Sequence, residues 1–530
     1  MSYADNFKNI PQSDPIPFRP MAQNAAGGYV FEIDDWQRLR RFLILGCEGG
    51  TYYEGERKLT IENAACIKRC LAADGLRTVR EIIEISDRGL AIKNDPAIFA
   101  LACVTVFGDA IARTAAFEAL PKVCRIGTHL FQFAEAREAL GGGWGRSACR
   151  AVSKWYLDRD DIVHQALKYQ QRGGWSHRDL LRLAHPKAHG DVAKVLNAIC
   201  RPEKWAEVDD PLAEGWIKAQ HAERADEVAG IITTHNLPRE MIPTQFLVFP
   251  EVWAALLPHM PMTALVRNLG NLSKCGLLKP LSEASKTVSA KLADEDAIKR
   301  SRLHPFSILL AAKVYQSGHG ARGKGEWLPV PQVVDALDRA FDLAFHNVEP
   351  TGLRHVLGVD VSGSMRFSVS AAMSCAEAAA AMALITARVE PNHYIMGFST
   401  EFKDLGITAR DTLPTVLEKT SRHNFGGTDT AVAVRWALDQ KVETDVFVIY
   451  TDNETWAGDK HTCEAIKEYR RKTGIPAKLA VVAFTGTNRS VADGSDPGSM
   501  DFVGMAASLP QALAAFAQLD AYDDRERGDG

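Results

Sequence analysis

Between Trp36 and Ala344 the sequence has the apolar periodicity of amphipathic helices. Apolar residues recur three and four positions apart, as in Val192, Val195, Leu196 and Ile199. Breaks rich in glycine, proline or asparagine interrupt this pattern at short intervals, for example at residues 141–145 and 186–190. The pattern predicts helices of roughly 10 to 18 residues joined by short loops.

Some 300 residues of short helices are too many for one compact bundle. A stack of helical hairpins, in which each pair buries its apolar face on the next, is the favoured arrangement. The sequence shows no strict period, so we expect degenerate repeats of the HEAT kind.

After Pro350 the pattern changes to apolar strands that alternate with helices. The expected strands are residues 354–360, 393–398, 445–451, 478–484 and 500–503, and the expected helices are 367–389, 430–440, 461–472 and 510–519. This alternation predicts a parallel sheet covered on both faces, which binds ligands beyond the carboxyl ends of its strands. We therefore expect a helical-repeat domain at residues 1–352 and an α/β domain at residues 353–530.

Composition excludes several classes of protein. Of the 530 residues, 46% are hydrophobic and 24% charged, which is typical of a globular protein. The most apolar uncharged stretch, residues 502–519, is too polar for a membrane span, and the N-terminus has no secretory pattern. The ten cysteines form no CxxC pair, so we expect reduced thiols and a cytoplasmic location.

Positive charge is concentrated in one stretch of the helical half. Residues 121–190 carry 12 basic and 6 acidic side chains and five histidines, whereas residues 353–530 carry 18 basic and 24 acidic ones. A local excess of this kind suits a phosphate-binding face, although an ordinary solvated face could also carry it by chance.

A sequence motif for metal binding stands at the end of the first expected strand. Asp360, Ser362 and Ser364 occupy alternate positions, so one carboxylate and two hydroxyls can converge as the chain turns. Thr428 and Asp452 lie in two further loops of the same α/β pattern. Such oxygen donors suit a hard divalent cation such as Mg²⁺. The alternative is that the hydroxyls only cap the helix that follows.

This spacing resembles the metal-ion-dependent adhesion site of von Willebrand factor A domains. The resemblance implies that Ser362, Ser364 and Thr428 bind the metal directly, while Asp360 and Asp452 act mostly through water. Asn453 stands where many members have glycine. In that family one coordination position is left open for a carboxylate of a partner, and no general base or nucleophile is apparent nearby, so we expect docking and no catalysis.

Candidate RNA-binding side chains gather within residues 168–185. Lys168 and Arg172 are four positions apart, and Gly173 and Gly174 are expected to end their helix. Cationic and donor groups on adjoining turns can bind successive phosphates, and a histidine can contact backbone or base edges. The predicted set is Lys168, Arg172, His177, Arg178, Arg182 and His185. Trp175 could stack on a base, but packing in the core is the more ordinary role of such a residue.

Three stretches resemble the Ro autoantigen family of TROVE-domain ribonucleoproteins: residues 168–186, 302–309, and 315–320 with Arg322, Gly323 and Lys324 following. The compact length and the expected absence of a signal sequence suit a bacterial member of that family. The resemblance implies a closed ring of helical hairpins clasped by the A domain. It also implies single-stranded ends of misfolded RNA in the hole, Y-like small RNA on the outer surface, no DNA ligand, and a 3′ to 5′ exoribonuclease as a partner.

Two main hypotheses follow. The first is a non-catalytic RNA-binding scaffold for RNA quality control, and the second is a metal-dependent protein-docking module whose helical half is only a support. A metal-dependent nuclease is disfavoured because no clustered carboxylates offer two-metal geometry.

Overall fold

A computed structural model describes residues 10–24, 26–32, 34–45, 65–87, 93–320, 325–366, 368–370, 373–422, 427–452, 455–484, 489–496, 498–503 and 509–518. The chain divides into two compact units that interleave in sequence. Unit 1 comprises residues 1–58, 302–313 and 341–530, and unit 2 comprises residues 59–301 and 314–340. The expected boundary between a helical domain and an α/β domain at residues 352 and 353 stays a prediction.

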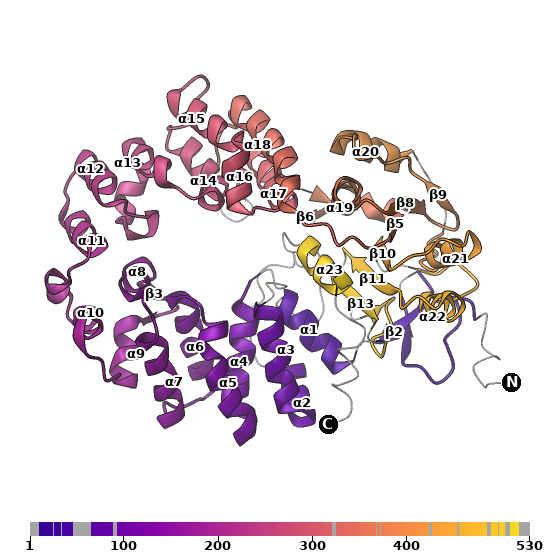
Figure 1. Ribbon diagram of the computed structural model, residues 1–530, viewed down its shortest axis with the longest axis horizontal. Helices are drawn as coiled ribbons and strands as arrows, with labels where there is room; N and C mark the ends of the chain where they lie inside the picture. Colours follow the sequence, from indigo (N-terminus) through magenta and orange to yellow (C-terminus); the bar gives the residue numbers. More distant parts are fainter. Residues whose placement is uncertain are drawn as a thin grey trace. The chain divides into compact units, whose positions relative to one another are not determined.

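Unit 2 is a curved series of short helices (Figure 1). The helices are α2 (Ala65–Ala73), α3 (Gly75–Asp87), α4 (Asp95–Phe107), α5 (Ala110–Val123), α6 (Gly127–Ala139), α7 (Arg146–Leu157), α8 (Ile162–Lys168), α9 (His177–Ala184), α10 (Gly190–Cys200), α11 (Pro211–His221), α12 (Ala225–His235), α13 (Pro250–Leu256), α14 (Met262–Lys274), α15 (Glu283–Leu292), α16 (Glu295–Ser301) and most of α18 (Pro331–Leu343). The helix α17 (Pro305–Gln316) contributes to both units.

Packing between neighbours in this series stabilises helices that are too short to be stable alone. The contacts of α3 with α5, α4 with α6 and α12 with α13 are among the most extensive in the protein. Residues Pro96–Thr105 of α4 are all buried, which fits its position between other helices. N-caps mark several helix starts; Asp109, for example, accepts a hydrogen bond of 2.7 Å from the Ala112 amide. The predicted helical-repeat class is confirmed for this unit.

Unit 1 is built on a six-stranded sheet in the order β13-β11-β10-β5-β8-β9. The strands are β5 (His355–Asp360), β8 (His393–Phe398), β9 (Phe402–Asp404), β10 (Val446–Thr451), β11 (Lys478–Ala483) and β13 (Ser499–Val503). All pairs are parallel except β8 with β9. The predicted α/β class is confirmed, and β9 adds a short antiparallel edge.

The expected helices of unit 1 agree with the structure except at the first, and the helix over Leu413–Ser421 was not predicted. The observed helices are α19 (Cys375–Val389), α20 (Leu413–Ser421), α21 (Val432–Asp439), α22 (Thr462–Thr473) and α23 (Leu509–Gln518), with α1 (Asp35–Leu45) nearer the N-terminus. The first helix was expected from residue 367. Instead, the strands β6 (Ser368–Ser370) and β7 (Met373–Ser374) form a small hairpin before α19, so that expectation was wrong by about two turns.

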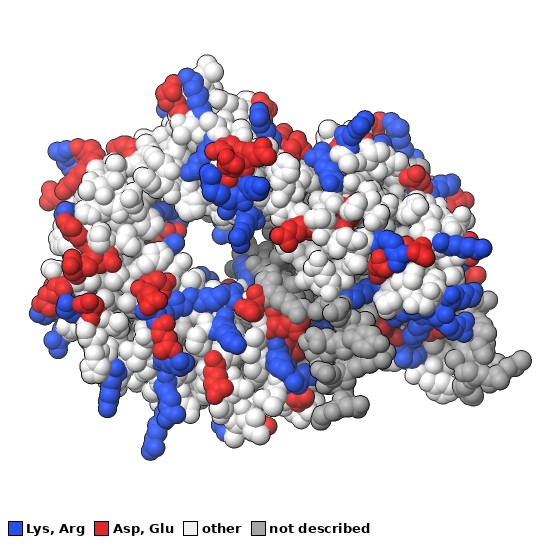
Figure 2. Space-filling model, in the orientation of Figure 1, with Lys and Arg blue, Asp and Glu red and all other residues white. Residues whose placement is uncertain are grey.

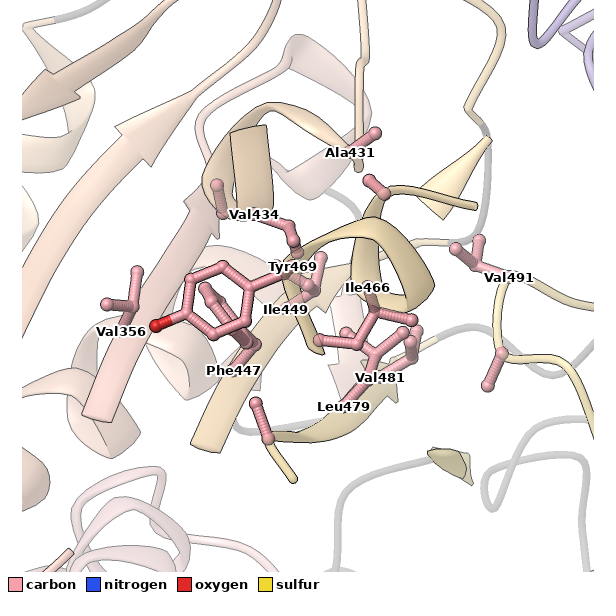
Figure 3. Packing of buried hydrophobic residues seen from close by; sticks show 14 of the residues in the cluster. Val356, Ala431, Val434, Phe447, Ile449, Ile466, Tyr469, Leu479, Val481 and Val491 are labelled. Atoms are coloured by element: carbon pink, nitrogen blue, oxygen red, sulfur yellow. The ribbon is translucent and has the colours of Figure 1, made fainter. Parts of the chain in front are cut away.

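One apolar core of unit 1 lies between the sheet and the helices α21 and α22 (Figure 3). The strands contribute Val356, Phe447, Ile449, Leu479 and Val481, and the helices contribute Val434, Ile466 and Tyr469. The Tyr469 ring packs edge-on against Phe447, with 5.1 Å between centroids, while its hydroxyl donates to the Val442 carbonyl at 2.7 Å. This core holds β5 and β10, the strands that lead into the metal motif.

The N-terminal segment is part of the same unit. The strands β1 (Met21–Gln23) and β2 (Tyr29–Glu32) form an antiparallel pair, and β2 also pairs with β12 (Arg489–Ser490). Val30 of β2 belongs to the same apolar core as the residues of α21 and α22. Among the described residues, no helix has the length and apolarity that would let it cross a membrane.

Candidate functional site

The predicted metal-binding side chains lie at the carboxyl end of the sheet in unit 1. Asp360 ends β5, and its carboxylate accepts hydrogen bonds from the Ser362 amide at 2.9 Å and the Thr451 hydroxyl at 3.1 Å. The Ser362 and Ser364 hydroxyl oxygens are 3.0 Å apart. The structure therefore brings three of the predicted residues, Asp360, Ser362 and Ser364, onto one turn of the chain.

The two predicted carboxylates are buried near each other. Burial raises the pKa of Asp360 to about 7, and the negative charge of Asp452 adds to the increase. Burial, together with the same charge, raises the pKa of the Cys375 thiol at the start of α19 to about 11. Two buried carboxylates repel each other unless a proton or a cation compensates for their charge. A divalent cation beside Asp360 and Asp452 fits this donor set.

Thr428 is buried and is anchored beside the loop that follows Asp452. Its carbonyl accepts hydrogen bonds from the Trp456 and Ala457 amides, each at 3.1 Å, and from the Thr455 hydroxyl at 3.0 Å. Two neighbours of the predicted residues, Gly426 and Asn453, lie outside the described residues. The loop that carries Thr428 and the loop that follows Asp452 are thus joined by hydrogen bonds to the Thr428 carbonyl.

The capping alternative is wrong for the helix that follows the motif. The N-cap of α19 is Ser374, whose hydroxyl accepts from the Glu377 amide while the Glu377 carboxylate accepts from the Ser374 amide. Ser362 and Ser364 lie one hairpin earlier and take no part in this capping box. Their hydroxyls therefore do not cap α19 and contact each other instead.

Residues of the N-terminal segment hold the same loops in place, which the sequence did not indicate. Gln12 is buried; its amide group donates to Asp429 Oδ1 at 2.7 Å and accepts from the Thr455 hydroxyl. Asn24 donates to the Thr455 carbonyl at 2.6 Å. Burial raises the pKa of Asp429 to about 6, and Arg435, which is ion-paired with it, opposes that increase. No local pattern near Gln12 could have revealed partners more than 400 residues away.

The predicted RNA-binding residues of unit 2 surround a small hairpin between α8 and α9. The strands β3 (Gln171–Arg172) and β4 (Trp175–Ser176) pair, and Gly173 and Gly174 form the turn with φ values of 59° and 81°. The helix α8 ends at Lys168. The expectation that Lys168 and Arg172 share a helix face was therefore wrong. Arg172 projects from the hairpin and lies 3.9 Å from Asp95.

The remaining cations of the set belong to α9. Ser176 caps this helix in a capping box with Asp179. Arg178 and Arg182 are exposed and have no hydrogen-bond or ion-pair partner among the described residues. His185 ends the helix in the left-handed region and is exposed, while Lys168 is half-buried with its Nζ 5.4 Å from the centre of the Tyr169 ring.

His177 is a correction to the predicted set. Only 2% of its surface is exposed, and its ring bonds to the Tyr156 hydroxyl at 2.8 Å and the Gln165 carbonyl at 3.3 Å. Burial lowers its pKa to about 4, which favours the neutral ring. The side chain at the start of α9 points into the core. It is therefore not accessible to RNA in this structure.

Charges of both signs are interspersed on the face of the molecule seen in Figure 2. Lys and Arg side chains occur over much of this face, with Asp and Glu between them. Neither sign of charge dominates this face. Any binding role has to be tested on particular residues.

Comparisons with known proteins agree with this architecture, a TROVE-type helical unit combined with a von Willebrand factor A domain. A model of the TROVE domain matches residues 22–225 and 234–314, and a model of the Ro60 vWA domain matches residues 354–517. The chain belongs to the Ro60 family.

Relatives of similar length support this assignment. The chain is 41% identical to the RNA-binding protein RO60 of Deinococcus radiodurans, over 97% of this chain and 98% of that protein. It is 34% identical to the RNA-binding protein RO60 of Caenorhabditis elegans, over 96% and 92% respectively. The crystal structure of the Deinococcus radiodurans RO (RSR) protein superposes with a TM-score of 0.78, covering 92% of this chain and 99% of that one.

The third matching stretch is only partly described. The helix α17 ends at Gln316, and His319 then forms an isolated β-bridge with Glu326. Arg322, Gly323 and Lys324 lie outside the described residues. The nine cysteines among the described residues form no disulfide.

Proposed function

We propose that this chain is the RNA-binding scaffold of a Ro-type ribonucleoprotein. The observation that carries the proposal is the pair Arg178 and Arg182 on α9, exposed and without partners among the described residues. Guanidinium groups four residues apart on one helix face can bind neighbouring phosphates. Arg172, Lys168 and His185 extend this cationic set on either side. The names of the two relatives, both RNA-binding proteins, support the same function.

The RNAs that we propose as ligands are those that the family resemblance implies. A Y-like small RNA would bind the outer surface of a closed helical ring, and single-stranded ends of misfolded RNA would enter its hole. The protein would present such ends, in the cytoplasm, to a 3′ to 5′ exoribonuclease. We propose no DNA ligand and no catalysis by the chain itself.

We further propose that Asp360, Ser362, Ser364, Thr428 and Asp452 hold a divalent cation, Mg²⁺ in the first instance. The ion would supply a positively charged coordination position for a carboxylate of a protein partner. Asp360 contributes compensating charge and holds the Ser362 amide through its Oδ1. The ring of contacts from Thr428 to Thr455 keeps the second loop in place.

A salt titration with matched variants tests the RNA proposal. Double substitution of Arg178→Gln and Arg182→Gln should weaken binding of a stem-loop RNA and lower the salt slope by about 0.9 for each lost phosphate contact. The control substitutes Arg410→Gln and Arg422→Gln, two exposed arginines of the A domain.

The outcome also separates RNA binding from the metal-dependent docking module. If the α9 variant binds RNA as tightly as the parent at physiological salt, the cationic set is an ordinary solvated face. If the parent itself shows no salt-dependent RNA binding but captures an acidic protein only with Mg²⁺, docking is the principal function.

A further inference from the structure

A pocket of about 560 Å³ lies beside the cationic set, between the end of α6, the β3–β4 hairpin and α9. It is lined by Glu138, Gly173, Gly174, Trp175, Asp179, Arg182 and Leu183. Its volume is within the range of about 300–1,000 Å³ that is usual for small-molecule sites. The pocket combines the ring of Trp175 and the carboxylates of Glu138 and Asp179 with the guanidinium of Arg182. Binding of phosphates by the cationic set does not account for the ring and the carboxylates.

The opposite charges in this pocket do not neutralise each other. Neither the Glu138 carboxylate nor the Arg182 guanidinium has a hydrogen-bond or ion-pair partner among the described residues. The Asp179 carboxylate uses its Oδ2 to accept from the Ser176 amide and hydroxyl in the capping box. Glu138 is thus a free acceptor and Arg182 a free donor in the same pocket.

The ring of Trp175 packs against the ring of Trp144. Its ring lies 5.6 Å from that of Trp144, centre to centre, and it is only partly buried. The turn beside it consists of two glycines in the left-handed region, and a Cβ on Gly174 would meet no atom within 4 Å. The absence of side chains at this turn keeps the pocket open next to the Trp175 ring.

We propose that this pocket binds one unstacked base of RNA, with guanine preferred, and this inference rests on the proposed RNA-binding function. Trp175 offers a surface on which a base can stack. Arg182 can bind the phosphate of the same nucleotide. Glu138 is an acceptor only, so it selects a base edge that donates hydrogen bonds.

Guanine is the base that fits this acceptor best. Its N1–H and its 2-amino group lie side by side and can donate to the two oxygens of one carboxylate. Adenine and cytosine offer an amino group with a neighbouring acceptor, and uracil offers a single N–H. A carboxylate that reads the Watson–Crick edge therefore discriminates in the order guanine, then adenine or cytosine, then uracil.

The test measures binding of three labelled pentanucleotides to the full chain by fluorescence anisotropy. Their sequence is UUXUU, with X as guanine, hypoxanthine (which lacks the 2-amino group) or uracil. The parent should prefer guanine over uracil by about tenfold, with hypoxanthine between them, because guanine makes two hydrogen bonds to the carboxylate, hypoxanthine one, and the carbonyls of uracil flank its single N–H. Glu138→Gln should remove most of this preference, and Glu118→Gln, an exposed glutamate of α5 outside the pocket, should leave it unchanged.

A second variant tests stacking. Trp175→Ala should weaken all three oligonucleotides by about tenfold, and Trp175→Phe should restore most of the affinity. If the alanine variant does not fold, the phenylalanine variant together with Glu138→Gln still decides the question. Equal binding of the three bases by the parent, or an equal effect of Glu138→Gln and Glu118→Gln on every base, overturns the inference.

A stem-loop RNA bound in parallel distinguishes the two levels of failure. If the parent binds the stem-loop with the expected salt dependence but shows no base preference, only the base pocket is wrong. If it binds neither RNA, the proposed function fails and the pocket fails with it.

Discussion

Gln12 and Asp429 are 417 positions apart in the sequence and are joined by a buried hydrogen bond of 2.7 Å from Gln12 Nε2 to Asp429 Oδ1. The same side chain accepts from the Thr455 hydroxyl, which also donates to the Thr428 carbonyl at 3.0 Å. One amide side chain of the N-terminal segment thus connects the loop that carries Thr428 with the loop that follows Asp452. The segment is therefore a structural part of the A domain.

Gln12→Ala should destabilise unit 1 and weaken divalent-ion binding. The substitution leaves Asp429 Oδ1 without one donor and the Thr455 hydroxyl without one acceptor, and each such loss in a buried site costs about 1–3 kcal/mol. Denaturant unfolding and calorimetric Mg²⁺ titration measure the two effects. Gln23→Ala is the matched control, because Gln23 is exposed and, among the described residues, its side chain donates only to the nearby Gly27 carbonyl. Equal stability of the two variants would contradict the linking role of Gln12.

Gly458→Ala should be more destabilising than Gly474→Ala. Both glycines have positive φ, 100° and 72°, so alanine costs roughly 1–2 kcal/mol of backbone strain at each. A Cβ at residue 458 would also lie 2.5 Å from the buried Asp429 carboxylate, whereas nothing lies within 4 Å of one at residue 474. Overpacking of this kind adds about 1–3 kcal/mol. Thermal unfolding of the two variants side by side checks the difference, which should vanish if the Asp429 loop can shift freely.

Ser362→Ala should lower the affinity for Mg²⁺ by at least about tenfold while leaving the fold intact. The hydroxyl is only partly buried, and its partner among the described residues is Ser364 Oγ at 3.0 Å, so its removal disturbs little else. A lost oxygen ligand, in contrast, directly weakens a hard-ion site. Isothermal titration calorimetry compares the variant with Ser421→Ala, an exposed serine of α20. Unchanged affinity in the Ser362 variant would remove the metal assignment.

Local patterns predicted the five parallel strands of unit 1 to within a residue or two, because each of them is a short apolar run bounded by polar turns. The short edge strand β9 was not predicted. The structure gives β8 at His393–Phe398, as expected, and β5 and β10 begin one residue later than expected. The hairpin before α19 could not be predicted this way, since the true helix start depends on the capping box of Ser374 and Glu377. Helix propensity alone cannot choose between two credible starts.

The position of a side chain depends on partners that are distant in sequence. His177 stands next to Arg178 and was expected on the surface with it, but Tyr156 and Gln165 supply hydrogen-bond partners inside the protein. Similarly, Gln12 carries no sign of its role, because its partners lie beyond residue 428. Residue type and spacing therefore predicted that Asp360, Ser362 and Ser364 lie together on one turn, while metal binding there stays a prediction. On α9 they predicted exposure only for the residues that face away from the core.

The burial of His177 should make the stability of the protein depend on pH. Its folded-state pKa is about 4, below the ordinary 6.5, so the unfolded chain takes up a proton first as pH falls. The stabilising contribution is complete above pH ~6.5 and is lost progressively toward pH ~4, amounting to about 3 kcal/mol. Neutral His177 can donate from Nε2 to the Gln165 carbonyl and accept at Nδ1 from the Tyr156 hydroxyl, whereas protonation would place a second N–H against that hydroxyl.

His177→Gln, which cannot be protonated, should lower stability at pH 7.5 but give a shallower decline between pH 6.5 and 4. Partly buried His129 and buried His304, whose pKa values burial also lowers to about 4, keep part of the slope in both proteins. Urea unfolding at several pH values measures the effect, with the exposed His189→Gln as control. Parallel pH profiles for the His177 variant and the parent would mean that the ring is hydrated or already charged in the native state.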